Sequence, residues 1–215
     1  MPKDLDSILG ALSLKAAPEQ CLALLRYVDL LQRWNAVYNL TAVREREAML
    51  TQHLADCLAV VQPLRRRVAQ GRILDVGSGG GLPGIVLAIM LPALDVTCVD
   101  AVAKKAAFVQ QAAGVLNLPN LHAAHARVES LIAPPFELIV SRAFASLADF
   151  TALTRPLLPP SGLWMAMKGK SPAQEIAALP EAVEVFHVEH LSVPGLDAER
   201  CLVWMRARAE TEASP

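Results

Sequence analysis

The sequence predicts an α/β fold in which a doubly wound, mostly parallel sheet follows a helical N-terminal section, the two forming one compact unit. Three observations favour this fold. Residues 1–70 repeat apolar positions at helical spacing. Residues 71–208 alternate short apolar runs with helix-like stretches, which is typical of parallel strands joined by right-handed crossovers. A glycine-rich loop directly after the first apolar run indicates a ligand site.

The individual elements follow from these patterns in chain order. Helical spacing is clearest at Cys21, Leu24, Leu25, Val28 and Leu31, and an arginine run at 65–67 closes the helical section. We expect strands at 73–76, 94–99, 137–140 and 163–167, separated by helices at 85–90, 104–115 and 147–158. Two further strands, at 183–190 and 201–206, predict an antiparallel hairpin at the edge of the sheet.

Composition limits the class of protein. Of the 215 residues, 53% are hydrophobic and 19% are charged, which indicates a globular chain rather than a disordered one. The formal net charge of −1 means that any nucleic-acid surface is local. The start, MPKDLDSILG, lacks a signal-peptide pattern, and no apolar stretch reaches the roughly 18 residues of a membrane span. We therefore expect a cytoplasmic protein.

The cysteines indicate neither a zinc site nor a redox motif. Cys21, Cys57, Cys98 and Cys201 lie far apart, without a C-x-x-C pair. We expect buried, reduced thiols and no bound metal.

The glycine loop lies within the segment ILDVGSGGGLPG at 73–84 and directly follows an expected strand. Because its glycines have no side chains, main-chain N–H groups can approach a ligand closely. A phosphate-binding P-loop is excluded because Ile85 and Val86, rather than Lys-Ser/Thr, follow the last glycine. Gly79, Gly81 and Gly84 satisfy the dinucleotide pattern G-x-G-x-x-G, which alone is weak.

The spacing of two acids favours S-adenosylmethionine instead. Asp75 precedes the glycines, where a carboxylate suits a cationic sulfonium and amino group but opposes a pyrophosphate. Asp100 ends the next strand, where a carboxylate can accept hydrogen bonds from both ribose hydroxyls. Methyl transfer is therefore preferred over two alternatives, a NAD-dependent oxidoreductase and a non-catalytic nucleotide-binding regulator.

The acceptor atom can be narrowed by elimination. The chain has Val140-Ser141-Arg142-Ala143-Phe144 where amino methyltransferases of adenine or cytosine carry Asn/Asp-Pro-Pro-aromatic, and it has no Pro-Cys for methylation at a pyrimidine carbon. The N7 nitrogen of guanine has an exposed lone pair and needs no general base, so placement in line with the sulfonium suffices.

Several sequence blocks resemble the glucose-inhibited division protein B family, bacterial methyltransferases that modify guanine N7 in small-subunit (16S) ribosomal RNA. The resemblance covers roughly residues 20 to 206. Its blocks are RWNAVYNLTAV at 33–43, QHLADCL at 52–58, LDVGSGGGLPGIVLAI at 74–89, RVES at 127–130, VSRAFASL at 140–147 and MKGK at 167–170. QHLADC replaces the commoner RHLLDS pattern, and the loss of that arginine weakens the expectation of an RNA contact there.

The resemblance implies a class I methyltransferase (Rossmann-like) fold with a seven-stranded sheet, S-adenosylmethionine as cofactor, and ribosomal RNA or the small subunit as partner of a monomer. It implies cofactor contacts at Gly77, Gly79, Leu82, Asp100, Val128, Glu129 and Arg142, with Val128 and Glu129 beside the adenine. Arg142, after the strand at 137–140, would also assist catalysis by placing the target. RNA contacts would come from Asn39, Thr41, His53, Lys168 and Lys170.

Some of these residues have ordinary structural alternatives. Asn39 and Thr41 could cap the following helix, and His53 could be a structural histidine. Trp34 and Tyr38 lie four apart on a helix, which favours core packing over base stacking. The basic residues at 65–67, with Lys104 and Lys105, could form a phosphate track or a solvated surface.

Overall fold

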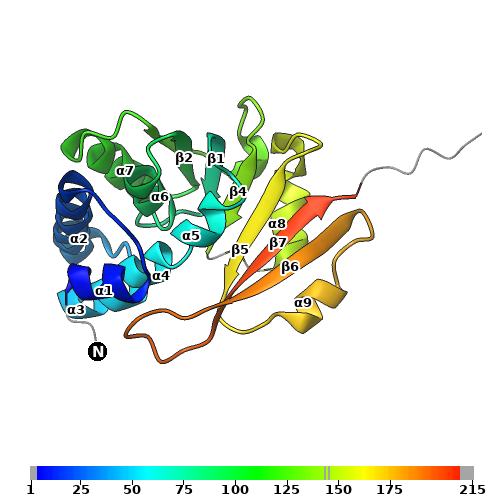
Figure 1. Cartoon of the computed structure of the whole chain (residues 1–215). Coiled ribbons are helices and arrows are strands. Elements are labelled where there is room, and N and C mark those ends of the chain that lie inside the picture. Colours follow the sequence, from blue (N-terminus) through cyan, green and yellow to red (C-terminus); the bar gives the residue numbers. More distant parts are fainter. Residues whose placement is uncertain (1–3, 143, 145, 209–215) are drawn as a thin grey trace, which may run out of the picture.

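A seven-stranded sheet forms the centre of the molecule in the computed structural model, which describes residues 4–142, 144 and 146–208. The strand order is β3-β2-β1-β4-β5-β7-β6 (Figure 1). The strands are β1 (Gly71–Val76), β2 (Leu94–Asp100), β3 (Leu121–His125), β4 (Leu138–Ser141), β5 (Leu163–Lys168), β6 (Val183–Leu191) and β7 (Arg200–Ala207). β1 to β5 run parallel, and β7 lies antiparallel between β5 and β6. The predicted parallel sheet and its antiparallel edge hairpin are confirmed.

Strand β3 is the one strand that the residue pattern did not predict. Its sequence, LHAAH, holds no β-branched or aromatic residue, and Leu121 is its only buried side chain. It pairs with β2 alone, at the edge of the sheet. Its strand conformation therefore comes from that pairing rather than from local propensity.

The helices between the strands lie close to their predicted positions. They are α6 (Gly84–Met90), α7 (Ala103–Val115) and α8 (Leu147–Thr154), the last continuing into the 3₁₀ turn η3 (Arg155–Leu157). A 3₁₀ turn, η2 (Val128–Ser130), and a short helix, α9 (Ala173–Ala177), complete this part of the chain.

The N-terminal section is helical, as predicted. It contains α1 (Leu5–Ala11), α2 (Pro18–Tyr38), α3 (Arg46–Met49), the π-helical segment η1 (Leu50–Ala55), α4 (Asp56–Leu58) and α5 (Val61–Arg65). Pro18 opens α2 at a position where its missing N–H costs nothing, and Asn39 ends that helix in the left-handed conformation, with φ of 49°.

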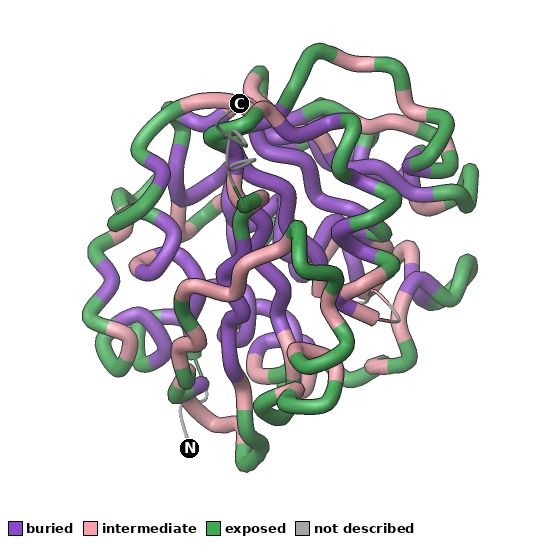
Figure 2. The backbone as a smooth tube through the Cα atoms, turned by 90° about the vertical axis from the view of Figure 1, so that its right-hand side faces the viewer, coloured by how far each residue is buried: buried purple, intermediate pink, exposed green. Residues whose placement is uncertain are grey.

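Alternate residues of each strand enter two different apolar clusters, one on each face of the sheet. Ile73, Val96 and Val140 pack with the N-terminal helices, α6 and α7. Leu74 and Ile139 face the other way and pack with α8. The layers are thus helices on both faces of a buried sheet, and the central strands form the most buried part of the backbone in Figure 2.

Helix α2 packs directly on the glycine loop after β1. The Tyr27 hydroxyl donates a hydrogen bond of 2.7 Å to the carbonyl of Gly80, and a Cβ on Gly80 would stand 2.9 Å from the Leu31 side chain. The helical section therefore holds the loop in place from outside the sheet.

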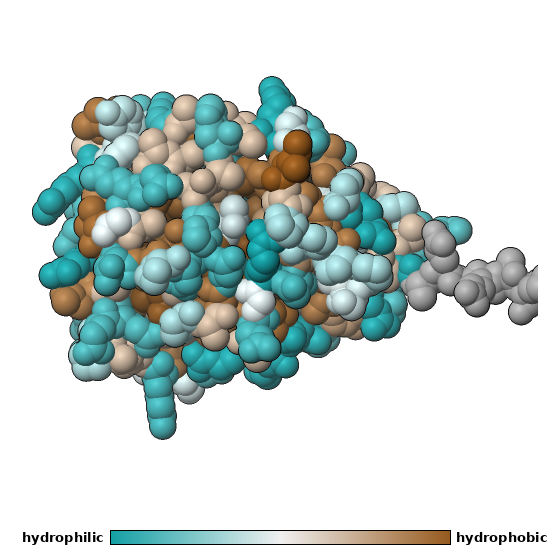
Figure 3. Space-filling view, turned by 90° about the horizontal axis from the view of Figure 1, so that it is seen from above, coloured by the Kyte–Doolittle hydropathy of each residue, from teal (hydrophilic) through white to brown (hydrophobic). Residues whose placement is uncertain are grey.

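Hydrophilic and hydrophobic side chains are interspersed over the face seen in Figure 3. Within the described ranges, no helix combines the length and the apolar character that crossing a bilayer requires.

Candidate active site

The first pocket, which we call the glycine pocket, is a cavity of about 280 Å³ at the carboxyl ends of β1 and β2. Its walls include Gly77, Asp100, Val128, Glu129 and Phe144. The first four were predicted to bind a cofactor. Parallel sheets of this kind bind ligands at the carboxyl ends of their strands, so the location fits a ligand site.

Two glycines of this loop, Gly77 and Gly79, border open space. Gly77 and Gly79 have φ values of 67° and 56°, which L residues with a side chain rarely adopt. A Cβ on either glycine would meet no atom within 4 Å. The loop thus presents bare backbone to a volume that a ligand can fill.

Asp100 lies at the end of β2 and ties the loop to that strand. Its Oδ2 accepts a hydrogen bond from the Gly79 N–H at 3.0 Å, and its Oδ1 accepts one from the Val102 N–H at 2.9 Å. Lys105 approaches to 3.7 Å. Each carboxylate oxygen can accept a second hydrogen bond, so two ribose hydroxyls remain possible donors.

Asp75 is buried beneath the loop rather than in the wall of the glycine pocket. Its Oδ2 accepts the Gly84 N–H at 2.8 Å, at the start of α6, while its Oδ1 is buried without a partner among the described atoms. Burial raises the pKa of Asp75 to about 7, against the lowering effect of the Gly84 hydrogen bond and of Arg142. Asp75 therefore serves first as a cap of α6.

A second cavity, which we call the arginine pocket, has a volume of about 380 Å³ and lies at the carboxyl ends of β4 and β5. Its charged and polar wall residues are Gln52, His53, Asp56, Arg142, Lys168 and Arg200. The structure brings three predicted site residues together here: His53 from η1, Arg142 after β4, and Lys168 at the end of β5.

Asp56 joins two arginines from distant parts of the chain. Its Oδ2 lies 3.4 Å from Nη1 of Arg142, and its Oδ1 accepts a 2.9 Å hydrogen bond from Nε of Arg200. Only 3% of the Asp56 side chain is exposed. Sequence reasoning missed both Asp56 and Arg200, although Asp56 follows His53 by three residues, a spacing that places both on one helical face.

His53 is a buried neutral histidine. Its Nε2 lies 2.6 Å from the Thr41 hydroxyl, and its Nδ1 lies 3.4 Å from Nη1 of Arg142. Burial, and then the Arg142 charge, lower the pKa of His53 to about 4. The ring is therefore uncharged at neutral pH, and Thr41 holds it rather than capping a helix.

The remaining predicted RNA residues lie outside the arginine pocket or are already paired. Asn39 is exposed at the end of α2 and accepts a hydrogen bond from Arg44 at 3.3 Å. Lys170 is exposed beyond β5, whereas Lys168 forms a 2.8 Å ion pair with Glu175 of α9.

Three predicted cofactor residues, Gly79, Leu82 and Arg142, are not in the wall of the glycine pocket. Leu82 is buried in the core cluster beneath the loop. Arg142 faces the arginine pocket, although Phe144, two residues further on, lines the glycine pocket. The two pockets are therefore neighbours along one edge of the sheet, where the Ser141 hydroxyl of β4 donates to the Val76 carbonyl of β1 at 2.9 Å. Ala143 and Ala145, between these residues in the predicted block, lie outside the described residues.

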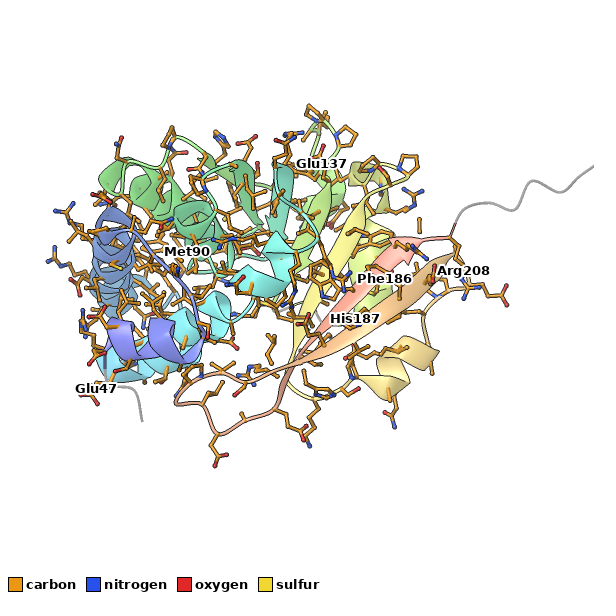
Figure 4. The ribbon with its side chains drawn as sticks, viewed as in Figure 1. Glu47, Met90, Glu137, Phe186, His187 and Arg208 are labelled. Carbon is orange, nitrogen blue, oxygen red and sulfur yellow. The ribbon has the colours of Figure 1, made fainter. Side chains whose placement is uncertain are left out.

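The basic residues that could have formed one phosphate track are far apart. The Arg67 guanidinium lies over the rings of Phe186, labelled in Figure 4, and Trp204, at 5.2 and 4.8 Å, on the β6–β7 side of the sheet. Lys104 and Lys105 belong to α7, which packs beside β2 and β3 at the opposite edge. The alternative in which these basic residues form a single phosphate track is therefore wrong.

Core packing of the aromatic pair is confirmed for Trp34 but wrong for Tyr38, which is exposed, and three of the four cysteines are buried as predicted. Trp34 is partly buried against Tyr38 and Phe108, with ring centroids 4.9 and 5.5 Å away. Cys57, Cys98 and Cys201 are buried free thiols, and Cys21 is half-buried. In the part of the chain that the structure describes, no three metal-ligating side chains are grouped to hold an ion.

Comparison with known proteins decides the family. Residues 20–203 match GidB, described as rRNA small subunit methyltransferase G. The chain belongs to the GidB family. It is 61% identical over 207 residues to Ribosomal RNA small subunit methyltransferase G of Acidovorax sp., covering 92% of this chain and 91% of that one. The protein of the same name from Leptothrix cholodnii is 58% identical, covering 97% and 98%. The resemblance to this family, inferred from the sequence blocks, is confirmed, and the GidB chain is an enzyme, a methyltransferase.

Solved structures of lower identity share the fold of this GidB chain. A SAM dependent methyltransferase from Aquifex aeolicus superposes with a TM-score of 0.57 at 14% identity, covering 74% of this chain and 92% of that one. TrmN from Thermus thermophilus gives a TM-score of 0.55 at 21% identity, covering 69% and 48%. The class I methyltransferase fold is confirmed.

Proposed function

We propose that this chain transfers a methyl group from S-adenosylmethionine to the N7 nitrogen of a guanine in 16S ribosomal RNA. The observation that carries the proposal is the glycine pocket: bare backbone at Gly77 and Gly79 facing open space, with the Asp100 carboxylate beside it. Membership of the GidB family and the names of its relatives support the RNA substrate.

The residues of the glycine pocket fit S-adenosylmethionine, which supplies an electrophilic methyl group on a cationic sulfur. Asp100 accepts hydrogen bonds from the ribose, while Val128 and Glu129 contact the adenine through a backbone N–H and a carboxylate. Gly77 and Gly79 leave room for the ligand. Leu82 acts indirectly, by anchoring the loop in the core.

The arginine pocket receives the acceptor, and its residues place the base rather than activate it. Guanine N7 attacks through a lone pair that it carries at neutral pH, so the N–C bond forms as the S–C bond breaks and no proton leaves. His53 has a pKa of about 4 and a contact to Thr41, which suits a fixed neutral wall and not a general base. Arg142, in the wall of the arginine pocket, orients the guanosine.

The RNA contacts extend beyond the pocket. Lys170 is exposed next to β5 and suits a phosphate of the RNA, and Asn39 with its partner Arg44 forms part of the outer contact surface. Residues 1–70 and 71–208 work as one unit, because α2 holds the glycine loop. A monomer acting on the small subunit in the cytoplasm, where ribosomes assemble, completes the proposal.

Mapping N7-methylguanosine in 16S ribosomal RNA from cells with and without this protein tests the function. We expect one modified guanosine to disappear and to return when the purified protein, S-adenosylmethionine and small subunits are combined. Replacing that guanosine with 7-deazaguanosine should abolish transfer but leave binding intact. Transfer to the deaza RNA would contradict the N7 assignment. Thermal protection by NAD, with none by S-adenosylhomocysteine, would favour an oxidoreductase instead.

A further inference from the structure

The arginine pocket holds more positive charge than the predicted RNA residues alone account for. Its wall contains Arg142, Arg200 and Lys168 against one acid, Asp56. Counting Glu175, which pairs with Lys168, two acids face three cations. A surplus of one positive charge in the wall of a pocket favours an anion.

Asp56 holds the two guanidinium groups without using up their hydrogen-bond donors. Arg200 donates through Nε to Asp56 and through Nη1 to the Glu199 carbonyl at 2.9 Å. The contacts of Arg142 with Gln52, His53 and Asp56 all involve Nη1, each at 3.4 Å. Among the atoms of residues 4–142, 144 and 146–208, Nη2 of Arg200 and both Nε and Nη2 of Arg142 have no acceptor. Planar donors left over on two fixed guanidinium groups match the geometry of phosphate oxygens.

The burial of these groups distinguishes the pocket from an ordinary surface ion pair. The Arg142 and Arg200 side chains are 24% and 25% exposed, and both oxygens of Asp56 are engaged. The Asp56 carboxylate is therefore not available to accept hydrogen bonds from the N–H groups of a guanine base. Its two arginines line the cavity and keep donors that these bonds do not use, which suits an acceptor-rich ligand.

We propose that Arg142 and Arg200, positioned by Asp56, form a subsite for the phosphate group next to the methyl-accepting guanosine. This inference rests on the proposed function. The subsite lies beside the glycine pocket along the same sheet edge, so a strand anchored here presents its neighbouring base to the cofactor. Arg200 contacts the RNA, whereas Asp56 is a positioning residue.

Direct binding tests the phosphate preference without requiring methyl transfer. The affinities of guanosine, guanosine 5′-monophosphate and guanosine 3′-monophosphate are measured by titration calorimetry on the protein saturated with S-adenosylhomocysteine. We expect at least one nucleotide to bind about 10-fold more tightly than guanosine, and added salt to reduce that advantage. Arg200→Gln should abolish the advantage and leave S-adenosylhomocysteine affinity unchanged. Equal binding of all three ligands, or an advantage that persists in Arg200→Gln, would overturn the subsite.

A matched control lies on the same strand. Arg206, at the other end of β7, pairs with Glu184 and lies outside the arginine pocket. Arg206→Gln should keep the wild-type phosphate advantage and the wild-type KM for small-subunit RNA. Arg200→Gln should raise that KM about 10-fold with little change in kcat, and lower the salt slope of RNA binding by about one. Identical kinetics and binding for the two variants would contradict the subsite.

The positioning role of Asp56 has its own readout. Asp56→Asn should raise the KM for RNA more than it lowers kcat, and Asp56→Glu should restore part of the loss because it keeps the charge. If Asp56→Asn fails to fold, the nucleotide titrations on Arg200→Gln still decide the proposal. A wild-type enzyme that leaves 16S ribosomal RNA unmethylated would instead contradict the proposed function, whatever the nucleotide titrations give.

Discussion

The carboxylate of Asp100 accepts a hydrogen bond from the backbone N–H of Gly79, so one side chain both shapes the glycine loop and lines the pocket beside it. This double role makes the residue sensitive to substitution in two ways. A change here removes an acceptor for the ligand and also a support for the backbone that the ligand touches.

Asp100→Ala should weaken S-adenosylhomocysteine binding by about 1.5 to 3 kcal/mol for each charged hydrogen bond lost, or roughly 10- to 100-fold for one bond. Asp100→Asn keeps an acceptor and should lose less. Calorimetric titration of both variants measures the difference. Unchanged affinity in Asp100→Ala would remove Asp100 from the cofactor site.

Gly77→Ala should impair both the fold and the ligand site. Because the backbone here has a φ of 67°, an alanine should lower the free energy of unfolding by about 1 to 2 kcal/mol. Its methyl group would also enter the open space of the pocket. Gly114→Ala is the control, because Gly114 lies in α7 with open space around it and no positive φ. That variant should gain roughly 0.5 to 1 kcal/mol and keep its ligand affinity. A tolerant Gly77→Ala would show that the ligand lies elsewhere.

His53→Gln should reduce the sensitivity of the fold to mild acid. The pKa of His53 is lowered from 6.5 to about 4, so between these values the unfolded chain binds a proton that the folded chain does not. This histidine therefore makes stability fall as the pH drops from 6.5 towards 4, by about 2 kcal/mol at pH 5. Denaturant unfolding at pH 7.5 and pH 5 should show that the variant loses less than the wild type. An equal loss would show that His53 is protonated in the folded protein.

Asp75→Asn should have the opposite effect on the same measurement. The pKa of Asp75 is raised from 3.8 to about 7, so below pH 7 the folded chain holds a proton that the unfolded chain lacks. The wild type gains stability from this group as the pH falls, by about 3 kcal/mol at pH 5, and the variant should not. The contributions of His53 and Asp75 to the pH dependence of stability are therefore opposite in sign and nearly cancel in the wild type. A variant with the wild-type pH dependence would place Asp75 in a more solvated state.

Lys170→Ala and Lys168→Ala should differ in their effect on RNA binding. Lys170 is exposed, and losing one phosphate contact should lower the slope of log affinity against log salt by about one. Lys168 is already neutralised by Glu175, so its removal should change the slope less. Filter binding across a salt series, with cofactor affinity as the reference, separates the two. The reverse ranking would make Lys168 the phosphate contact.

Local pattern predicted most of the sheet and its helices because the central strands are continuous apolar runs, buried on both faces and separated by helical stretches. It failed at β3, since LHAAH has no strand propensity of its own and depends on β2 for its conformation. The glycine pocket was predictable from strand order along the chain: Gly77 follows β1 and Asp100 ends β2, and the ends of these two paired strands meet at one sheet edge.

The arginine pocket was only partly predictable. Arg142 and Lys168 end neighbouring parallel strands, but Arg200 enters through an antiparallel strand whose place in the sheet no local pattern determines. Asp56 and Arg200 are 144 residues apart in sequence and meet through tertiary structure alone. A pairing of this kind becomes visible only when the strand order is known.

The insertion of β7 between β5 and β6 has a consequence for synthesis of the chain. Domains are made N-terminal end first, so the glycine pocket, built from residues that end at Leu153, is fully translated well before the last strand emerges. Until β7 arrives, β5 has an open edge and β6 has no neighbour within the sheet. During synthesis, the residues that line the glycine pocket are therefore made first, and Arg200 is added late. A transcript truncated before codon 200 would therefore encode a product that has all residues of the glycine pocket but lacks Arg200 of the arginine pocket.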